Sequence, residues 1–447
     1  AASDTSASAG SSTAAGSDTS AAGGVATDGF ESLGPVTLNV WSADNQTPGP
    51  LDVITNLSKQ FEAKYPNVKV KLTFKGFTDY INTVKLGLSG NDAPDIAEGN
   101  QGYQIDGDLV KAGLILPLDK YAAAYGWDKM YSPETLQQFQ WTDDGKTYGQ
   151  GTLWGVGQFG QSTGIFANAK KLKDLGIDPA SPPTTWADFE KVVLAIRAKL
   201  PKDEPVVNLG NKDGYELIHA WGMLQGANIP DAQAVRDWIF HKDGATFDTP
   251  ENVASLKELK AWVDAGVFGK DFNSVGENDA AAQFAKGKGV FYMGGNWQAG
   301  VIRDGLGADA LFINAPPGVS GKHIAIGSTS LPWHISAKTK YPDVAAAWIN
   351  FIISAQGAQE MYKYVQIPAV GDAPQPTGDP LLGQVATGWQ QLNQDGGLTF
   401  FTDWSSPTMF DTMGAAFQKL AAGKATPEEV AKTMQDDWEK FHAQLKK

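Results

Sequence analysis

The chain of 447 residues is long enough for two globular lobes, and its 42% hydrophobic and 19% charged residues are typical of a folded globular protein. Its net charge of -14 and its three arginines argue against nucleic-acid binding, because an acidic surface repels phosphate backbones. The absence of cysteine excludes disulfides and thiolate metal sites, and no window approaches the about 18 consecutive apolar residues of a membrane-spanning helix.

The N-terminal segment differs in composition from the rest of the chain. Apart from Val25, residues 1–29 are all Ala, Ser, Asp, Thr or Gly. Such a segment buries too little apolar surface to offset the entropy of ordering it, so we predict a disordered tether. It either holds a folded body away from a membrane or has no role of its own.

The body begins with a strand, a helix and a second strand. Residues 36–41 (VTLNVW) and 68–74 alternate apolar and polar side chains, whereas residues 51–65 repeat apolar side chains at helical spacing. A β-α-β unit of this kind predicts a parallel sheet with a right-handed crossover. A helix over 79–88 and a short strand in 93–99 (APDIAEG) continue the pattern.

The middle of the chain repeats the alternation of helices and strands. Thr185 and, three residues later, Asp188 form a capping-box signal for a helix. Alternation without a long break predicts the α/β class, and this length predicts two α/β lobes between which the chain crosses more than once. The further predicted elements are a strand at 204–210, helices at 214–226 and 249–266, a helix and a buried strand within 278–295, and three late helices at 342–365, 407–422 and 426–446.

No motif in the chain is typical of an enzyme. Residues 285–291 (AKGKGVF) lack the spacing and the hydroxyl residue of a phosphate-binding loop. Residues 155–160 (GVGQFG) have the spacing of a dinucleotide-binding turn, but no convincing helix follows them. The five histidines include no pair at helical metal-binding spacing. We therefore expect no cofactor and no bound metal, with a hydrolase that uses two unrecognised carboxylates as the alternative.

Neutral polar and aromatic residues follow the predicted strands, in the runs SADNQ, EGNQGYQ, GQFGQS, NKDGY and NWQ. Ligands of α/β sheets bind beyond the carboxyl ends of strands. Amides and carboxylates match hydroxyl groups, and aromatic rings cover the apolar face of a pyranose, whereas an anionic ligand favours arginine. These runs predict a carbohydrate ligand. The preference of turns for Asn, Gly and Asp offers another explanation, but it does not account for Trp297 or Tyr103.

Six runs in the body follow one another in a recognisable order. They are FEAKYPNVKV (61–70), APDIAEG (93–99), GKTYGQGTLWGVGQFGQSTGIFAN (145–168), TTWADF (184–189), FAKGKGVFYMGGNW (284–297) and AGKATPEEVAKTMQDDW (422–438). Through these runs the body, from about residue 36 to the C-terminus, resembles the extracellular solute-binding proteins of bacterial ABC transporters, in the carbohydrate-binding group that includes maltose-binding proteins. The N-terminal tether is similar to that of lipid-anchored members, in which an acylated Cys that is absent from this chain precedes the tether.

The resemblance implies two lobes that close on a ligand, an N-terminal lobe of residues 30–157 and 331–397 and a C-terminal lobe of 158–330 and 398–447. It implies a monomeric receptor, not an enzyme, at the extracellular face of the membrane. This receptor would bind an oligosaccharide and deliver it to the permease subunits of an ABC importer. The Trp that matches Trp297 would stack on a sugar ring. The ligand positions implied in this way are Asp44, Asn45, Asn100, Gln101, Tyr103, Gln158, Phe159, Gln161, Asn211, Asp213, Tyr215, Asn296, Trp297, Asp403 and Trp404.

Overall fold

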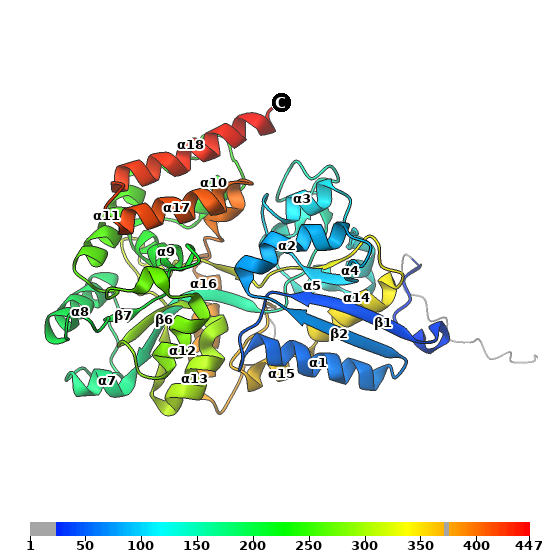
Figure 1. Cartoon of the computed structure of the whole chain (residues 1–447), viewed down its shortest axis with the longest axis horizontal. Helices are drawn as coiled ribbons and strands as arrows, with labels where there is room; N and C mark the ends of the chain where they lie inside the picture. Colours follow the sequence, from blue (N-terminus) through cyan, green and yellow to red (C-terminus); the bar gives the residue numbers. More distant parts are fainter. Residues whose placement is uncertain (1–23, 371–374) are drawn as a thin grey trace, which may run out of the picture.

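The computed structural model describes residues 24–370 and 375–447, which form two lobes side by side, each built on its own sheet (Figure 1). The two-lobed α/β architecture is as predicted. Most of the predicted tether, residues 1–23, lies outside the described part of the chain. Among the helices of the described part, none is long and apolar enough to cross a lipid bilayer.

The first lobe is organised by a four-stranded sheet of order β11-β3-β1-β2. The parallel strands β1 (Val36–Ser42) and β2 (Val68–Phe74) are joined by helix α1 (Pro50–Lys64), so the predicted β-α-β unit is confirmed. On its other edge, β1 pairs in parallel with β3 (Ile96–Glu98). The strand β11 (Trp333–Ile335) comes from a distant part of the chain and pairs antiparallel with β3.

Helices cover both faces of this sheet. The apolar faces of α1 and α14 share one core cluster, and the apolar face of α2 belongs to another. The predicted helix over 342–365 is divided into two helices, because the Ser354 hydroxyl accepts the amide N–H of Gly357 and caps a new helix start. The remaining elements of this lobe are α2 (Phe77–Ser89), α3 (Asp106–Lys111), α4 (Asp119–Tyr125), α5 (Trp127–Met130), α6 (Pro133–Gln137), the hairpin β4 (Gln140–Trp141) and β5 (Thr152–Leu153), α14 (Pro342–Ile352) and α15 (Ala355–Lys363).

The second lobe is organised around β6 (Gly160–Asn168), a strand that is buried along its whole length. β6 pairs antiparallel with β8 (Phe291–Gly295), β9 (Ala310–Ile313) and β10 (Gly327–Thr329). Only β7 (Val207–Asn208) and β8 form a parallel pair in this sheet. The predicted alternation of helices and strands is thus built here on a sheet that is mostly antiparallel. β6 runs away from the first lobe and β10 runs back to it, so these two neighbours must be antiparallel.

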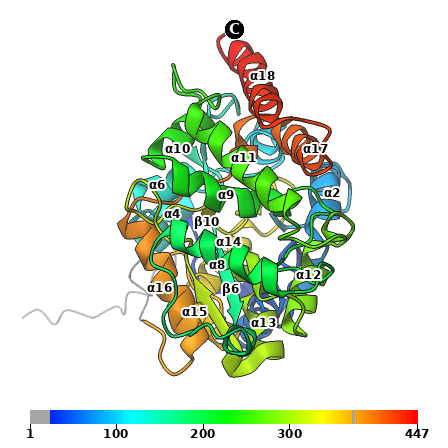
Figure 2. The same ribbon diagram turned by 90° about the vertical axis from the view of Figure 1, so that its left-hand side faces the viewer.

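The helices of the second lobe pack around this sheet (Figure 2). The buried α9 lies beneath α11 and α17, and α18 packs on both of them. Thr185, Thr249 and Thr426 each accept the amide N–H three residues ahead, as N-caps do. The helices are α7 (Ala169–Asp174), α8 (Trp186–Lys199), α9 (Glu216–Asn228), α10 (Gln233–Ile239), α11 (Pro250–Asp264), α12 (Glu277–Ala285), α13 (Ala299–Leu306), α16 (Pro380–Gln394), α17 (Met409–Ala421) and α18 (Pro427–Leu445).

The predicted boundary between lobes at residue 397 differs from the structure. Helix α16 packs on β9 and β6 of the second lobe. The amide of Phe312 donates to Gln384 Oε1 at 2.8 Å, and Asn314 Nδ2 donates to the carbonyl of Gly388 at 2.8 Å. The last crossing between the lobes therefore lies before α16, because the apolar face of this helix covers the second sheet.

The predicted end of the tether at residue 29 also differs from the structure. Val25 is 1% exposed within the core of the first lobe, and the amide of Ala26 donates to Asp343 Oδ2 at 3.1 Å. The folded body therefore includes Val25 and Ala26, whose composition resembles the tether but whose contacts do not.

Candidate ligand site in the cleft between the lobes

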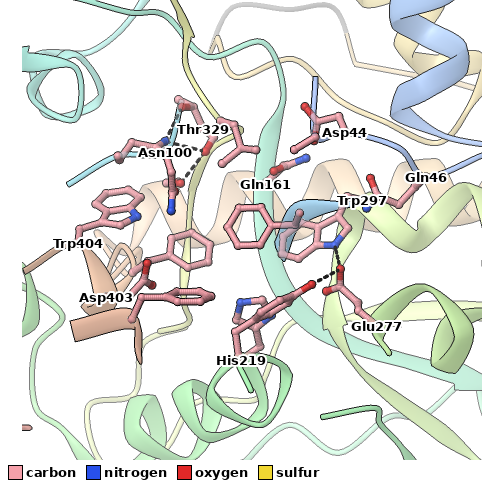
Figure 3. Close-up of a pocket in the computed structure, with 18 residues that line it drawn as sticks. Asp44, Gln46, Asn100, Gln161, His219, Glu277, Trp297, Thr329, Asp403 and Trp404 are labelled. Carbon is pink, nitrogen blue, oxygen red and sulfur yellow. Dashed lines mark hydrogen bonds between the residues drawn. The ribbon is translucent and has the colours of Figure 1, made fainter. Parts of the chain in front are cut away.

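The two lobes enclose a cleft at the carboxyl ends of β1, β3 and β8, with the first residues of β6 as its floor (Figure 3). Its volume is about 100 Å³. That volume is small against the roughly 300–1,000 Å³ of typical ligand pockets, so the lobes stand in a closed arrangement. The cleft is lined by Ala43, Asp44, Gln46, Phe77, Asn100, Gln101, Gln161, Tyr215, His219, Glu277, Trp297, Ser328, Thr329, Leu331, Phe401, Asp403, Trp404 and Phe410.

Direct contacts between the lobes surround the cleft. Asn278 Nδ2 donates to Asn45 Oδ1 at 3.1 Å, and the Thr78 hydroxyl donates to Asp213 Oδ1 at 3.0 Å. On another side, the amide of Tyr103 donates to the carbonyl of Trp404 at 3.1 Å. These contacts bridge the rims of the cleft and would have to break for the lobes to separate.

Eight of the fifteen predicted ligand positions line this cleft. They come from the ends of β1 and β3, from the start of β6, from the segment before α9, from the turn after β8 and from the turn that precedes α17. These eight residues are Asp44, Asn100, Gln101, Gln161, Tyr215, Trp297, Asp403 and Trp404.

Four other predicted positions support the scaffold and do not line the cleft. Gln158 Oε1 accepts from Trp333 Nε1 at 3.3 Å, and Phe159 is fully buried where the chain crosses between the lobes. Asn211 Oδ1 accepts the amide of Leu217 at the start of α9. Asn296 Nδ2 donates to the carbonyl of Gly160. One polar atom each of Gln158, Asn211 and Asn296 is thus used in a contact that supports the scaffold.

The last three predicted positions contribute to contacts between the lobes. Asn45 and Asp213 make the two hydrogen bonds described above at the rim of the cleft. The ring of Tyr103 lies 4.6 Å from that of Phe441 and 5.0 Å from that of Trp141. Tyr103 was predicted as a cleft residue because it follows a strand, but its ring packs in this aromatic cluster.

Ten residues of the lining were not predicted. Several lie in the first turns of helices, whereas the prediction considered residues that follow strands. Phe77 begins α2, Glu277 begins α12, and His219 lies one turn into α9. The aromatic run FFTDW did give a signal for Phe401, although only Asp403 and Trp404 were selected from it. The full set is Ala43, Gln46, Phe77, His219, Glu277, Ser328, Thr329, Leu331, Phe401 and Phe410.

Trp297 is held by contacts with Gly295, Glu277 and His219. A Cβ atom placed on Gly295 would lie 2.2 Å from three carbons of the benzene ring, so this ring lies directly over the glycine. Trp297 Nε1 donates to Glu277 Oε1 at 3.2 Å, and the ring of His219 meets the indole edge-on at 5.6 Å. The indole is 8% exposed, and what remains uncovered belongs to the cleft wall.

Glu277 and His219 have no cationic partner in the cleft. Glu277 accepts from Trp297 and, at 3.5 Å, from the hydroxyl of Tyr215. Burial raises the pKa of Glu277 to about 7, a value that these hydrogen bonds moderate. Burial lowers the pKa of His219 to about 4, so its imidazole is neutral at physiological pH and offers one donor and one acceptor.

Behind Asp44 lies Glu98, which is buried at the end of β3. Glu98 Oε1 accepts from the hydroxyl of Ser42 and, at 3.1 Å, from the amide of Ala43. Burial, and then the negative charge of Asp44, raise the pKa of Glu98 well above its usual range. Burial also raises the pKa of Asp44, an effect that the neighbouring Glu98 side chain partly offsets.

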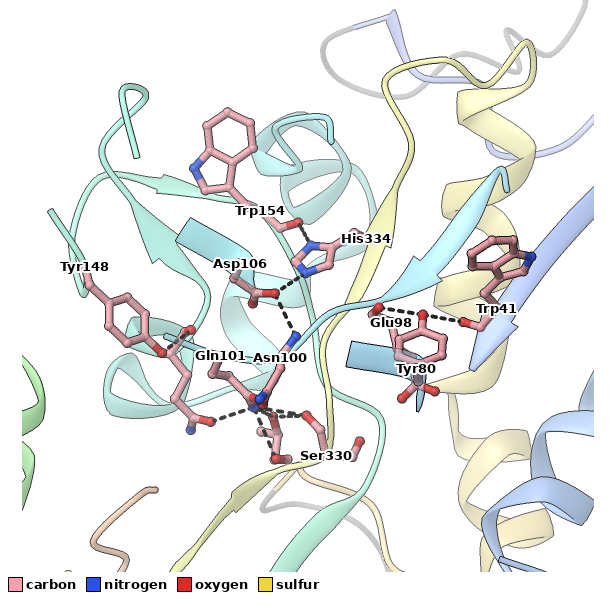
Figure 4. Close-up of polar contacts among 12 residues, drawn as sticks. Trp41, Tyr80, Glu98, Asn100, Gln101, Asp106, Tyr148, Trp154, Ser330 and His334 are labelled. Carbon is pink, nitrogen blue, oxygen red and sulfur yellow. Dashed lines mark hydrogen bonds and ion pairs between the residues drawn. The ribbon is translucent and has the colours of Figure 1, made fainter. Parts of the chain in front are cut away.

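The loop after β3 is fixed by a buried pair of His334 and Asp106 (Figure 4). His334 Nε2 lies 2.9 Å from Asp106 Oδ1, which also accepts the amide of Asn100 at 2.9 Å. Asp106 raises the pKa of His334 against the opposing effect of burial. Gln101 Nε2 in turn donates to the carbonyls of Thr329 and Ser330 in the crossing segment. The side-chain amide of Asn100 is left directed at the cleft.

The charge of the lining is one-sided. Asp44, Glu277 and Asp403 contribute carboxyl groups, and neither Lys nor Arg lines the cleft. Burial raises the pKa of Asp403 to about 7. Within residues 24–370 and 375–447, no group of three His, Asp or Glu side chains is placed to hold a metal ion. The cleft therefore offers amides, carboxyls, one neutral imidazole and aromatic rings.

A two-lobed α/β fold with a polar, aromatic cleft between the lobes defines a solute-binding protein. The chain belongs to the bacterial extracellular solute-binding protein family, whose sequence pattern matches residues 47–359. It is 25% identical over 321 residues to the multiple sugar-binding protein of Streptococcus mutans, covering 69% of this chain and 70% of that protein. It is 22% identical over 335 residues to the sn-glycerol-3-phosphate-binding periplasmic protein of Escherichia coli K12, covering 69% of each.

Solved structures share the fold. A chitin oligosaccharide binding protein superposes with a TM-score of 0.77 at 21% identity, over 92% of this chain and 99% of that chain. A solute-binding protein in complex with raffinose superposes with a TM-score of 0.69 at 17% identity, over 91% of this chain and 99% of that chain.

Proposed function

We propose that this protein binds a short, uncharged oligosaccharide in the cleft and delivers it to the permease of an ABC importer. The observation that carries the proposal is that Trp297 is held in a fixed position in the cleft wall. Its indole is fixed by Gly295, Glu277 and His219, and its remaining surface faces a cleft of amides and carboxyls. A rigid ring beside hydrogen-bonding groups suits a pyranose, which has an apolar C–H face and a rim of hydroxyls.

The charge of the cleft narrows the ligand class. A phosphate or a uronic acid needs cationic or backbone donors, and the lining contains three carboxyl groups with no Lys or Arg. This arrangement differs from what an sn-glycerol-3-phosphate-binding relative requires, and it agrees with the sugar, chitin oligosaccharide and raffinose binding named for other relatives.

The proposal also includes the location of the protein and the permease that receives the sugar from it. As a member of an extracellular family, the protein would act outside the cell as a monomer, carried by a lipid anchor beyond the N-terminal tether. The permease subunits of the importer would receive the sugar from the closed lobes. Catalysis is not part of the proposal, although Glu277 and Asp403 have the raised pKa values that general acids need.

One experiment tests ligand class and reaction together. The purified protein is incubated with raffinose, maltose-type, chitin and xylan oligosaccharides and, separately, with sn-glycerol 3-phosphate. We expect at least one neutral oligosaccharide to raise the melting temperature, no new reducing ends to form, and the phosphate to have no effect. New reducing ends would support the hydrolase alternative, and a stabilising effect of the phosphate alone would overturn the proposal.

A further inference from the structure

We infer that Glu277 is a positioning residue for sugar binding: its side chain holds the indole of Trp297 in the orientation that meets the ligand. The inference rests on the proposed function, because it concerns the ring that we propose to contact the sugar. Glu277 begins α12, whereas Trp297 lies in the short 3-10 turn Asn296–Gln298 that follows β8.

Few contacts define the orientation of the Trp297 indole. Gly295 carries no side chain to hold the indole sideways, and it provides a flat support below the ring. The ring of His219 packs in a T-shaped contact with the indole. The single hydrogen bond that fixes the rotation of the indole is the one from Nε1 to Glu277 Oε1, at 3.2 Å.

The two donors that face the Glu277 side chain require a hydrogen-bond acceptor. Trp297 Nε1 can only donate, and the Tyr215 hydroxyl also points its donor at Glu277 Oε1. A carboxylate accepts both bonds, and bonds to an ionised acceptor are roughly twice as strong as those between neutral groups. One acceptor therefore orients two aromatic residues of the cleft wall.

Glu277 is itself held in place by hydrogen bonds of its backbone and of the next residue. Its backbone amide donates to Asp213 Oδ2 at 3.4 Å, and Asp213 also accepts the hydroxyl of Thr78 in the first lobe. The next residue, Asn278, bonds to Asn45 of the first lobe and to Gln298 beside the tryptophan. In the closed arrangement, Glu277 is therefore flanked by residues that contact the first lobe, Asp213 and Asn278. A movement of the Glu277 side chain would disturb Trp297.

The groups around Glu277 are consistent with a carboxyl group that ionises near neutral pH. Asp213, Tyr215, Glu216 and His219 face it from the start of α9, and Tyr292 faces it from β8. None of these groups is cationic at neutral pH, and burial raises the pKa of Glu277 to about 7. The ionised form accepts more strongly, so we expect affinity to decrease as the pH falls from 8 to 6.

The test uses two substitutions and a matched control. Glu277→Met removes the acceptor at similar length, and Glu277→Gln keeps an acceptor oxygen that cannot ionise. Glu190→Met removes an equivalent bond, from Trp262 Nε1 at 2.8 Å, on the outer side of the same lobe. Calorimetry is performed with the oligosaccharide of the panel that binds the wild type most tightly. We expect Glu277→Met to lose about tenfold in affinity and Glu190→Met to change it less than about twofold.

A second readout does not depend on the sugar. In protein labelled with 5-fluorotryptophan, the Trp297 resonance is assigned from Trp297→Phe and followed by fluorine NMR between pH 6 and 8. We expect it to titrate in the wild type, to be shifted and pH-independent in Glu277→Gln, and to be unchanged in Glu190→Met. Because Asp403 titrates in the same range, Asp403→Asn serves to show that the titration persists without that carboxyl group.

The outcomes separate the inference from the proposed function. Wild-type affinity in folded Glu277→Met, together with a large loss in Trp297→Ala, would overturn the positioning role and leave sugar binding at the cleft intact. Wild-type affinity in both variants would overturn the proposed contact with Trp297 itself. If Glu277→Met does not fold, a Trp297 resonance in Glu277→Gln that titrates as in the wild type would contradict the inference.

Discussion

Trp297 is largely buried, and yet it forms part of the cleft wall, so a change at this residue affects both packing and ligand contact. Trp404, another aromatic residue of the wall, differs from it. The rings of Phe400 and Phe401 stack on Trp404 at 5.4 and 5.5 Å, which leaves less of that indole for a ligand. Among the tryptophans of the described residues, only Trp297 and Trp404 line the cleft, and Trp297 has the freer ring.

Replacing Trp297 by alanine should weaken sugar binding by about 2–4 kcal/mol, or roughly 30- to 1,000-fold. The reason is that a rigid aromatic anchor at the centre of a binding site contributes contact area at low entropy cost. Titration calorimetry measures the affinity and thermal denaturation measures the stability of the same variant. Trp41→Ala is the control, because Trp41 packs on Gly87 of α2 and does not line the cleft.

If Trp297 only packed the core, the same substitution would cost about 3–5 kcal/mol of folding stability and the folded fraction would bind normally. A stable Trp297→Ala protein with wild-type affinity would contradict the proposed contact.

Sequence reasoning identified cleft residues where one rule applied, that ligands lie beyond the carboxyl ends of strands. Asp44, Asn100 and Trp297 follow β1, β3 and β8 in this way. Glu277 and His219 were not identified, because they lie on helices whose direction toward the cleft depends on how the two lobes pack. Tyr103 follows a strand but turns into an aromatic cluster that includes residues of α18, and nothing local in the sequence reports that contact.

At the scale of elements, local signals predicted most helices and strands of the body, including the N-cap at Thr185. The assignment of elements to lobes was harder. Helix α16 follows α15 in the chain but packs on β9 of the second lobe. Its apolar residues belong to the core cluster of that lobe that contains Phe166 and Phe312. That choice depends on which sheet has an uncovered face, a tertiary property that periodicity does not contain.

The N-terminal segment gives a test at the element scale. Deleting residues 1–23 should leave the melting temperature nearly unchanged, because these residues are almost entirely small or polar. Deleting residues 1–29 should lower the stability by about 2 kcal/mol, because it also removes the buried Val25 and the bond from Ala26 to Asp343. Differential scanning calorimetry of both truncations measures the difference. Equal melting temperatures would show that Val25 contributes nothing to the folded body.

At the scale of the whole molecule, the closed arrangement of the lobes determines access to the site. The lobes approach so closely that a Cβ on Gly102 would lie 2.4 Å from Trp404 Cα. The hydrogen bonds from Thr78 to Asp213 and from Asn278 to Asn45 can form only in this arrangement. Three chain crossings, near residues 155–160, 329–333 and 364–370, would have to bend when the lobes separate.

Binding should therefore shift an ensemble of more open conformations toward the closed one. Small-angle X-ray scattering with and without the bound oligosaccharide should show a smaller radius of gyration in its presence. A saturating concentration that leaves the radius unchanged would count against closure about these crossings.

The buried carboxyl groups predict how stability depends on pH. Burial raises the pKa of Glu258 to about 8 and that of Glu216 to about 10, above the values in an unfolded chain. Between pH 7 and 9 the native state therefore binds more protons than the unfolded state, and stability decreases as the pH rises. His334, with its raised pKa, changes stability in the same direction.

We expect the melting temperature to fall by a few degrees from pH 7 to pH 9 at constant ionic strength. Calorimetry of the wild type and of Glu258→Gln checks this, since the variant should depend less on pH. A melting temperature that rises with pH over this interval would show that these groups are ionised in the native state.

The central claim is that a neutral sugar binds between the lobes with a ring on Trp297. The most direct test is a crystal structure of the complex with the oligosaccharide that binds most tightly. We predict closed lobes, a pyranose ring over the indole of Trp297, and hydroxyls bonded to Asp44, Asn100 or Asp403. A sugar seated outside the cleft, for example in the groove between α16 and residues 313–317, would contradict the account.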